Sequence, residues 1–355
     1  MNTKAFFNDK NYHAFTALEK AHFLSFAPYA FQASLCLRDF GILDFLLQHQ
    51  DGVQFEDIKP NRTLSHYALR VLVEAGIGIG LIIEENGTYF ITKTGILFIT
   101  DKMVRVNTDF MQDICYEGAF KLKESLLHGK PEGLPFLGPW NTIYEGLSKL
   151  DAKKTKSWFD FDNFYSDHVF ALALPIVFKN NPKTILDIGA NTGKFSIHCM
   201  QYNQDVQMHL LDYAGQLAMA EKNMQEKNLD RYQLIPHNIL NQQTAIPGQY
   251  DVIWMSQFLD CFSDEEIKQI LIKCKAALNP NGRIFINETF WDQQAHHAAM
   301  YSLQMTSLYF TTQANGNSQM YDSRIFIKLI EEVGLTIKQV NHGIATTHSL
   351  IEISL

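Results

Sequence analysis

The sequence predicts an α/β protein in which a doubly wound sheet follows a mainly helical N-terminal domain. From Pro182 onward, short apolar runs typical of strands alternate with stretches of helical periodicity, which is the pattern of a doubly wound sheet. Before Ala75 the periodicity is helical, and a hairpin pattern with an Asn86-Gly87 turn comes next. The length of 355 residues fits two domains and a connecting segment.

The composition argues against several classes of protein. A net charge of −8 at pH 7 disfavours a general nucleic-acid binder. The start of the chain lacks the apolar core of a signal peptide, and the longest apolar run, Val169–Phe178, is half a membrane span. No cysteine pair has metal-ligand or redox-motif spacing among Cys36, Cys115, Cys199, Cys261 and Cys274. We therefore expect free thiols, no metal, no membrane contact and a cytoplasmic location.

Residues 1–100 predict a winged-helix-like domain. Ser65 is placed to cap a helix, and residues 81–92 have the pattern of a hairpin wing. That helix carries Arg70 as its one firm positive charge and the wing tip is acidic, which disfavours DNA reading. The helix expected over Phe23–Leu37 has more apolar surface than a domain of this size needs, so we expect a homodimer through this domain.

Residues 101–180 predict a helical connector with a turn-rich stretch at 129–140. Aromatic residues are dense between Trp158 and Phe170. We expect most of them to pack the domains together and some to wall an apolar acceptor pocket, because pockets favour domain junctions.

Residues 181–355 predict the sheet domain itself. Helices are expected at 194–201, 215–227, 264–278 and 323–333. Strands are expected at 184–188, 208–211, 232–235, 251–255, 282–287, 336–340 and 350–355.

The turn after the first of these strands has the pattern of a cofactor site. Asp187 precedes Gly189 and Gly193, which frame a sharp turn into a helix whose free N–H groups favour a nucleotide-like ligand. A dinucleotide fingerprint needs glycine at 189, 191 and 194, and Asn191 and Lys194 break it. Asn191 is a tolerable replacement because Asn adopts left-handed conformations readily. An ordinary strand-to-helix turn is the alternative at this point.

Polar residues also follow the second and third strands. Asp212 ends the second strand, where an acid accepts hydrogen bonds from both ribose hydroxyls of a cofactor. Asn238 follows the third strand, and its amide oxygen can accept a hydrogen bond from an adenine amino group. The residues expected around an adenosine are Asp212, Tyr213, Gln216, Leu217, Asn238 and Ile239.

The segment after the fourth strand contains a candidate base. Ser256 and Gln257 begin this loop, and Ser263 with Glu266 has the pattern of a capping box that opens the next helix. Asp260 lies just before the cap, at the mouth of the sheet, and is the candidate base.

The order and spacing of these motifs resemble those of O-methyltransferases with an N-terminal winged-helix dimerisation domain. This group includes plant phenolic, hydroxyindole and bacterial polyketide O-methyltransferases. The resemblance covers nearly the whole chain and rests on residues 187–193, 211–213, 257–266, 274–288 and 331–335.

This resemblance implies S-adenosylmethionine (SAM) as the cofactor, and a metal-independent transfer to a hydroxyl of a small aromatic or polyketide-like acceptor. It implies a homodimer as well. The cofactor contacts that it implies are Asp187, Gly189, Asn191, Gly193, Asp212, Tyr213, Leu217, Asn238, Ile239, Ser256 and Gln257.

The chain departs from the family pattern at the base. The family has a histidine after the fourth strand, and this chain has Asp260 there, followed by Cys261 and Phe262. An ordinary Asp, with a pKa of about 4, matches a phenol of pKa about 10 less well than His does. Burial among apolar groups raises the basicity of Asp260 in one interpretation. In another, Asp260 only orients the acceptor and a histidine takes the proton, from among His168, His296 and His297.

Two further carboxylates are expected near the base, and the sequence leaves the acceptor atom and a non-catalytic function open as alternatives. By the resemblance, Glu288 flanks and steers the base, and Asp322 lies near the second flanking position. The acceptor atom can also be N, S or C. A non-catalytic SAM-binding or winged-helix regulator is the non-enzyme alternative, and specific DNA binding in a gel-shift experiment distinguishes it.

Overall fold

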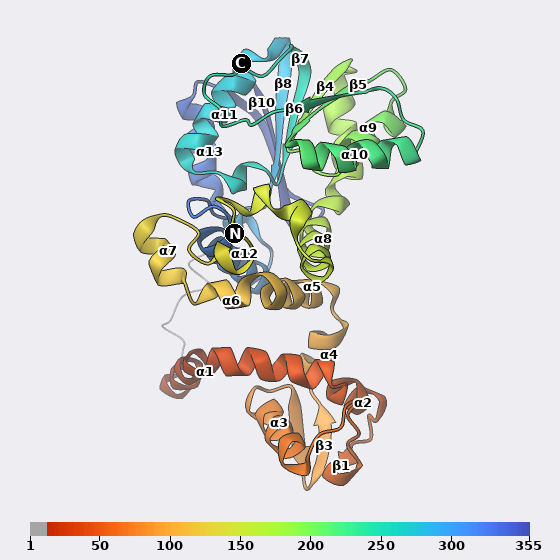
Figure 1. Ribbon diagram of the computed structural model, residues 1–355, viewed down its shortest axis with the longest axis vertical. Helices are drawn as coiled ribbons and strands as arrows, with labels where there is room; N and C mark the ends of the chain where they lie inside the picture. The colour runs from red at the N-terminus through yellow and green to blue at the C-terminus, as the bar shows by residue number, and fades with distance from the viewer. Residues whose placement is uncertain (1–12) are drawn as a thin grey trace. The chain divides into compact units, whose positions relative to one another are not determined.

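The computed structural model describes residues 13–355, with the exception of the side chains of 165–168. The chain forms two compact units, one ending at Asp109 and the other comprising residues 110–355 (Figure 1). Residues 110–180, expected as part of a separate connector, belong to the same unit as the large sheet. No helix in the described part of the chain has the length and apolar character that a membrane span requires.

Helices dominate the unit that ends at Asp109. Ser65 caps the third helix by accepting the Ala68 N–H at 3.1 Å, as expected. The hairpin is confirmed, because Asn86 and Gly87 take left-handed φ values of 52° and 83° in its turn. A three-stranded sheet in the order β1-β3-β2 completes the unit. Its elements are α1 (Ala14–Asp39), α2 (Ile42–Gln48), β1 (Val53–Gln54), α3 (His66–Gly78), β2 (Ile82–Glu85), β3 (Thr88–Ile91), α4 (Lys93–Thr100) and α5 (Lys102–Phe110).

The second unit is built on a seven-stranded sheet in the order β6-β5-β4-β7-β8-β10-β9. Its strands are β4 (Thr184–Ile188), β5 (Gln207–Asp212), β6 (Tyr232–Pro236), β7 (Tyr250–Ser256), β8 (Leu278–Glu288), β9 (Thr336–Ile344) and β10 (His348–Ser354). The first five pair in parallel, and β10 is antiparallel to both of its neighbours. The doubly wound sheet is confirmed. β8 begins before its expected start because Leu278 already pairs with Tyr250.

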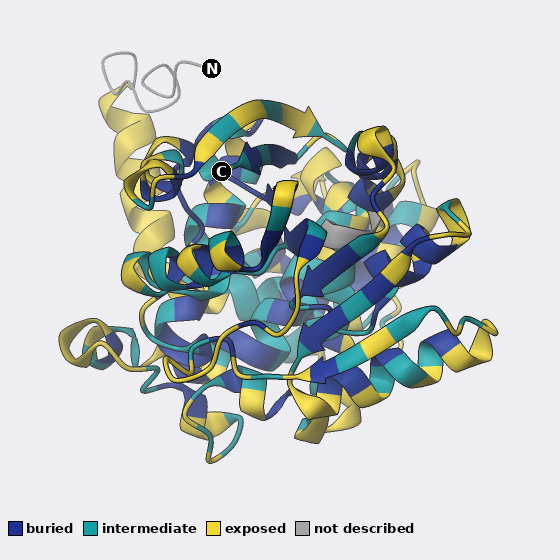
Figure 2. Cartoon of the chain, turned by 90° about the horizontal axis from the view of Figure 1, so that it is seen from above, coloured by how far each residue is buried: buried dark blue, intermediate teal, exposed yellow. Residues whose placement is uncertain are grey.

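Helices cover both faces of this sheet, and its central strands are largely buried, whereas the edge strands β6 and β9 are partly exposed (Figure 2). One core joins the strands to α8 (Ala152–Val177), α9 (Lys194–Tyr202) and α10 (Ala214–Glu226). The other joins them to α11 (Asp264–Ala276) and α13 (Ser323–Glu332). The capping box that opens α11 is confirmed, because Ser263 and Glu266 exchange both of its hydrogen bonds.

A third core lies between residues of the expected connector and a later helical segment. It includes Phe110, Ile143, Leu303 and Phe310. Its elements are a π-helical turn at Met111–Cys115, α6 (Tyr116–Ala119), α7 (Leu122–His128), α12 (His297–Tyr309) and a second π-helical turn, η11 (Phe310–Ala314). The Gln313 side-chain amide donates to the Cys115 carbonyl at 2.6 Å, which ties the two π-helical turns together.

The parallel strands bring four loops to one edge of the sheet. β4, β5, β7 and β8 end at Ile188, Asp212, Ser256 and Glu288. Because the carboxyl ends of parallel strands meet at the same edge, the expected cofactor turn and the candidate base lie beside each other.

Candidate active site

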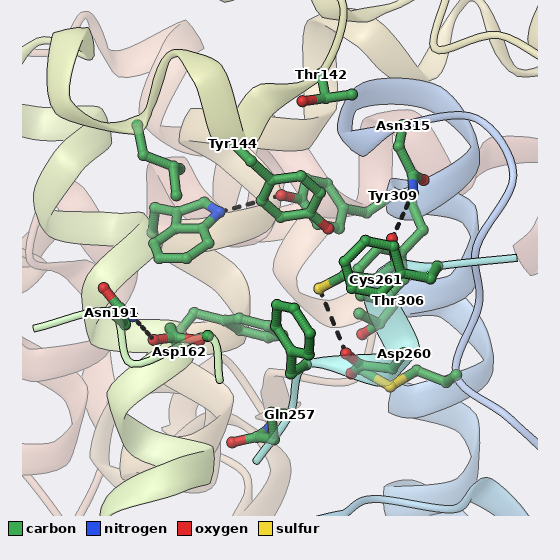
Figure 3. Close-up of a pocket in the computed structure, with 18 of the residues that line it drawn as sticks. Thr142, Tyr144, Asp162, Asn191, Gln257, Asp260, Cys261, Thr306, Tyr309 and Asn315 are labelled. Atoms are coloured by element: carbon green, nitrogen blue, oxygen red, sulfur yellow. Dashed lines mark hydrogen bonds between the residues drawn. The ribbon is translucent and has the colours of Figure 1, made fainter. Parts of the chain in front are cut away.

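A cavity of about 280 Å³ opens at this edge of the sheet. The loops after β4, β5, β7 and β8 form one side of it, and residues of α8, α12 and η11 form the other (Figure 3). The strand-end side is mainly polar and includes Asn191, Asp212 and Gln257. The opposite side is mainly aromatic, with Phe110, Trp158, Phe161, Tyr309 and Phe310 among its residues. The cavity therefore joins a polar half to an apolar half.

The turn after β4 has the strained backbone that its sequence predicts. Gly189, Asn191 and Gly193 have φ values of 71°, 48° and 76°. The left-handed conformation expected of Asn191 is confirmed. Gly189 is required for a second reason, since a Cβ there would lie 2.2 Å from the ring of Phe258 in the loop after β7. The turn thus depends on residues that tolerate positive φ and on one position that has no side chain.

Asp212 joins the turn after β4 to the loop after β5. Its carboxylate accepts the Asn191 N–H at 2.8 Å and the Tyr213 N–H at 2.6 Å. Partial burial raises the pKa of Asp212 to about 6, and the two backbone donors oppose this rise. Asp212 and Tyr213 both line the cavity, as the expected ribose site requires.

Asp187 at the end of β4 holds the strand and the following helix together. It is buried and accepts a hydrogen bond from the Ser196 hydroxyl at 2.7 Å, which links β4 to α9. Burial raises its pKa to about 7. A second, smaller cavity of about 70 Å³ is lined by Asp187, Ser256 and Gln257 together with the turn. Asp187 therefore faces this smaller space and not the main cavity.

Asp162 on α8 is a site residue that the sequence analysis missed. It accepts a hydrogen bond from the Asn191 side-chain amide at 3.1 Å and lines both cavities (Figure 3). The next residue, Asn163, accepts from Lys194 at 2.7 Å. The only signal in the sequence is this polar pair within an otherwise aromatic stretch, and no motif marks it.

Two buried carboxyl groups meet at the start of the loop after β7. Glu288 Oε1 accepts the N–H groups of Phe258 and Leu259 at 3.1 and 2.9 Å, so it holds the turn that presents Asp260. Burial raises the pKa of Asp260 to about 6. Burial and the nearby charge of Asp260 raise the pKa of Glu288 well above its ordinary value. Each of the two carboxyl groups is therefore a stronger base than an ordinary acidic side chain, and the two titrations are linked.

Asp260 faces the aromatic half of the cavity, where it lies beside a thiol. The Cys261 thiol donates to Asp260 Oδ1 at 3.4 Å (Figure 3). The Tyr144 hydroxyl points toward this pair in the same view. Burial raises the pKa values of the Cys261 thiol and the Tyr144 phenol, so both stay protonated at neutral pH.

Several expected site residues lie outside the main cavity. Leu217 and Ile239 are buried in the two sheet cores, and their neighbours Gln216 and Leu240 line the cavity. Asn238 is exposed, and its side-chain oxygen accepts the Leu240 N–H within its own turn. Asp322 caps α13 and pairs with Arg324.

The histidine alternatives to Asp260 find little support. His296 and His297 are exposed at the start of α12 and do not line the cavity. The side chain of His168 lies outside the described residues. No group of three or more His, Cys, Asp or Glu side chains among the described residues is arranged to hold a metal ion.

Comparisons with known proteins identify two domains in the chain. The model of the Dimerisation2-like domain matches residues 19–89, and the model of a methyltransferase domain matches residues 186–284. Demethylspheroidene O-methyltransferase of Rhodobacter capsulatus is 26% identical over 232 residues, which cover 63% of this chain and 55% of that protein. The 3-amino-4-hydroxybenzoate 4-O-methyltransferase of Streptomyces cremeus is 23% identical over 47% of this chain and 44% of its own. The chain thus matches about half the length of these relatives.

Solved structures show the same fold over nearly the whole chain. The SAM-dependent methyltransferase SibL is 20% identical with a TM-score of 0.68, covering 94% of this chain and 97% of its own. The O-methyltransferase NcsB1, solved with SAM and a naphthoic acid, is 16% identical with a TM-score of 0.63, covering 92% and 95%. The chain therefore combines a Dimerisation2-like domain with a methyltransferase domain, and both curated relatives named above are O-methyltransferases.

The contact between Gly189 and Phe258 predicts a sharp cost for a side chain at this glycine. We expect Gly189→Ala to lower the free energy of unfolding by at least about 2 kcal/mol, because it adds both a clash and a strained φ. Tryptophan fluorescence during denaturation measures this, since all four tryptophans lie in the second unit. Gly215→Ala is the control, because a Cβ there makes only ordinary contact with Ser148. Equal midpoints for the two variants would contradict the packing argument.

Proposed function

We propose that this chain, which combines a Dimerisation2-like domain with a methyltransferase domain, is a SAM-dependent O-methyltransferase of small, largely apolar hydroxyl compounds. The observation that carries the proposal is the position of Asp260. This buried carboxylate faces the aromatic half of a cavity whose other half is formed by the turn at Gly189 and by Asp212. A group that can take a proton thus lies between a nucleotide-type site and an apolar pocket.

The polar half of the cavity fits SAM. Among the described residues, Asn191 Oδ1 and Gln257 Oε1 are buried acceptor atoms without a hydrogen-bond partner. An ammonium group is a suitable donor to such oxygens, and the methionine end of SAM carries one. Asp212 would hold the ribose hydroxyls, and Tyr213, Gln216 and Leu240 surround the space beyond it. Asp162, bonded to the Asn191 amide, adds a carboxylate at the same end.

Bound SAM supplies an activated methyl group on a sulfonium sulfur. The residues of this chain align the acceptor oxygen, exclude water and receive a proton. The rings of Phe110 and Phe161 stack at 4.1 Å, and Trp158 donates to the Tyr309 hydroxyl at 3.1 Å, so the aromatic wall is fixed in place. Alignment in such a rigid apolar space accounts for much of the rate enhancement of a direct displacement.

Asp260 takes the proton that leaves the acceptor hydroxyl as its oxygen is methylated. The raised pKa of Asp260 lies closer to the pKa of the acceptor hydroxyl than the pKa of an ordinary Asp does. Glu288 acts through Asp260, because it accepts the N–H groups of Phe258 and Leu259 and so anchors the turn that presents Asp260. Burial thereby supplies the basicity that the family obtains from a histidine at this position.

We also propose a homodimer formed through the N-terminal unit. Phe23, Phe26 and Tyr29 on α1 have exposed fractions of 53%, 63% and 80%, and Tyr67 on α3 has 75%. Together they line an apolar groove on the unit that matches the Dimerisation2-like domain. A surface of this kind is typical of protein–protein interfaces. The five free cysteines fit a cytoplasmic location, which we propose as well.

Removal of the Asp212 carboxylate is expected to weaken cofactor binding. Asp212→Ala should raise the Kd for SAM by roughly a hundredfold, since two charge-assisted hydrogen bonds to ribose are lost. Isothermal titration calorimetry measures this change. The exposed Asp230 gives a matched control, and Asp230→Ala should keep the affinity of the unchanged protein. An unchanged Kd for Asp212→Ala would remove the ribose role.

Loss of the base is expected to affect turnover and not cofactor affinity. Asp260→Asn should lower kcat by about 10²- to 10⁴-fold, the usual contribution of a general base, with the Kd for SAM retained. In the unchanged protein kcat/KM should fall as the pH drops through about 6, because protonation of Asp260 removes the base. Glu265→Gln, an exposed change on the same segment, is the control. Normal turnover by Asp260→Asn on its acceptor would show that another group takes the proton.

A charge in the apolar groove of α1 should disrupt the dimer. Phe26→Glu places a carboxylate in this groove, and we expect a monomer by light scattering coupled to size-exclusion chromatography. Ile272→Glu, at an exposed apolar residue of α11, should leave the molar mass unchanged. If both variants keep the mass of the unchanged protein, the groove is not the interface.

A further inference from the structure

The lining side chains of the main cavity that ordinarily carry a charge at neutral pH are all carboxylates. They are Asp162, Asp212, Asp260 and Glu266, and none of the described residues that line it is a lysine, arginine or histidine. Asp162 and Asp212 lie by the cofactor turn, and Glu266 is engaged in the capping box of α11. Asp260 is therefore the charge that faces the acceptor half of the cavity.

Most polar groups of the acceptor half are already committed to internal hydrogen bonds. Thr306 donates to the Ser302 carbonyl at 2.9 Å, and Thr289 donates to the Met320 sulfur at 3.7 Å. The Asn315 amide donates to the Cys261 carbonyl at 2.6 Å, and the Cys261 thiol donates to Asp260. Of these groups only Asn315 keeps a donor, its second amide N–H.

Besides the Thr142 hydroxyl and the second Asn315 N–H, two phenols can donate to an acceptor. The Tyr309 hydroxyl accepts from Trp158, so its own proton is free to point elsewhere. The Tyr144 hydroxyl is buried and makes no hydrogen bond of good geometry to the described residues, although the Cys261 sulfur lies near enough to interact with it. It points toward Cys261 and Asp260 (Figure 3). A neutral oxygen beside the reacting hydroxyl would give this phenol a stronger acceptor than the Cys261 sulfur.

A ligand carboxylate in place of that neutral oxygen would be unfavourable. It would lie in an apolar, largely aromatic space, opposite the charge of Asp260 and without a cation to pair with. Burial of an unpaired charge is costly, and a like charge nearby adds to that cost. A phenol donor compensates only a small part of it.

We infer that the acceptor is an uncharged aromatic hydroxyl compound with a neutral oxygen next to the reacting hydroxyl, and that compounds with a carboxylate at that position are rejected. Asp260 receives the hydroxyl proton, and Tyr144 donates to the neighbouring oxygen. This inference rests on the proposed function. It also separates the chain from NcsB1, which shares the fold and was solved with a naphthoic acid. The charge selectivity belongs to the lining side chains and not to the fold.

A matched set of three ligands tests the inference. These are a naphthol, the same naphthol with an ortho acetyl group, and the same naphthol with an ortho carboxylate. Their Kd values are measured by calorimetry on the full chain saturated with S-adenosylhomocysteine. We expect the ketone to bind at least about tenfold more tightly than the carboxylate, because an unpaired like charge costs more than one factor of ten in affinity.

Variants of Asp260 and Tyr144 test which residue causes each binding preference. Asp260→Asn should reduce the preference for the ketone over the carboxylate, because it removes the opposing charge. Tyr144→Phe should reduce the preference for the ketone over the unsubstituted naphthol. Tyr301→Phe, an exposed tyrosine outside the cavity, should change neither preference.

The possible failures are distinguishable. If the unchanged chain does not bind S-adenosylhomocysteine, the proposed function itself is refuted. With that ligand bound, the acceptor inference is overturned if the carboxylate binds as tightly as the ketone, or if none of the three naphthols binds. Preferences that do not respond to Asp260→Asn and Tyr144→Phe would overturn the assigned roles of these residues.

Discussion

The close approach of the Phe258 ring to Gly189 is the contact on which the site depends. It allows the turn after β4 and the loop after β7 to touch, so the cofactor half and the candidate base occupy one cavity. A side chain at position 189 would force these loops apart. Asp212 reinforces the arrangement from the other side by accepting the Asn191 N–H. The geometry at the edge of the sheet thus depends on a glycine at position 189 and on the carboxylate of Asp212.

Much of the sheet unit could be predicted from the sequence because its strands are buried on both faces. β4, β7 and β8 contain the short apolar runs 185–186, 252–255 and 284–286, and buried runs of this kind leave few alternatives to a strand. The left-handed turn followed from residue types alone, since Asn and Gly are the residues that tolerate it. The expected positions beyond Asp212 were less accurate. Leu217 and Ile239 lie in the core while the adjacent Gln216 and Leu240 face the cavity, because a shift of one residue changes the face that a side chain occupies.

The aromatic half could not be predicted in the same way. Tyr144 lies on a short 3₁₀ turn, and Asp162 lies on a helix far from any motif. Neither has a periodic pattern that would point to a site. Their positions follow from the third core, which brings together residues near 110, 158 and 310. The basicity of Asp260 could not be predicted from the sequence either, because it depends on burial that only the fold reveals.

The two halves of the cavity come from different parts of the chain. The strand ends form the polar half, whereas α8, α12 and η11 supply most of the apolar half. Substitutions on α12 or η11 can therefore reshape the acceptor space without altering a strand or a cofactor contact. If the proposed function holds, enzymes of this fold could acquire new acceptors through these segments alone. Asp162 is the exception, because it lies on α8 and bonds to the cofactor turn, so changes there would affect both halves at once.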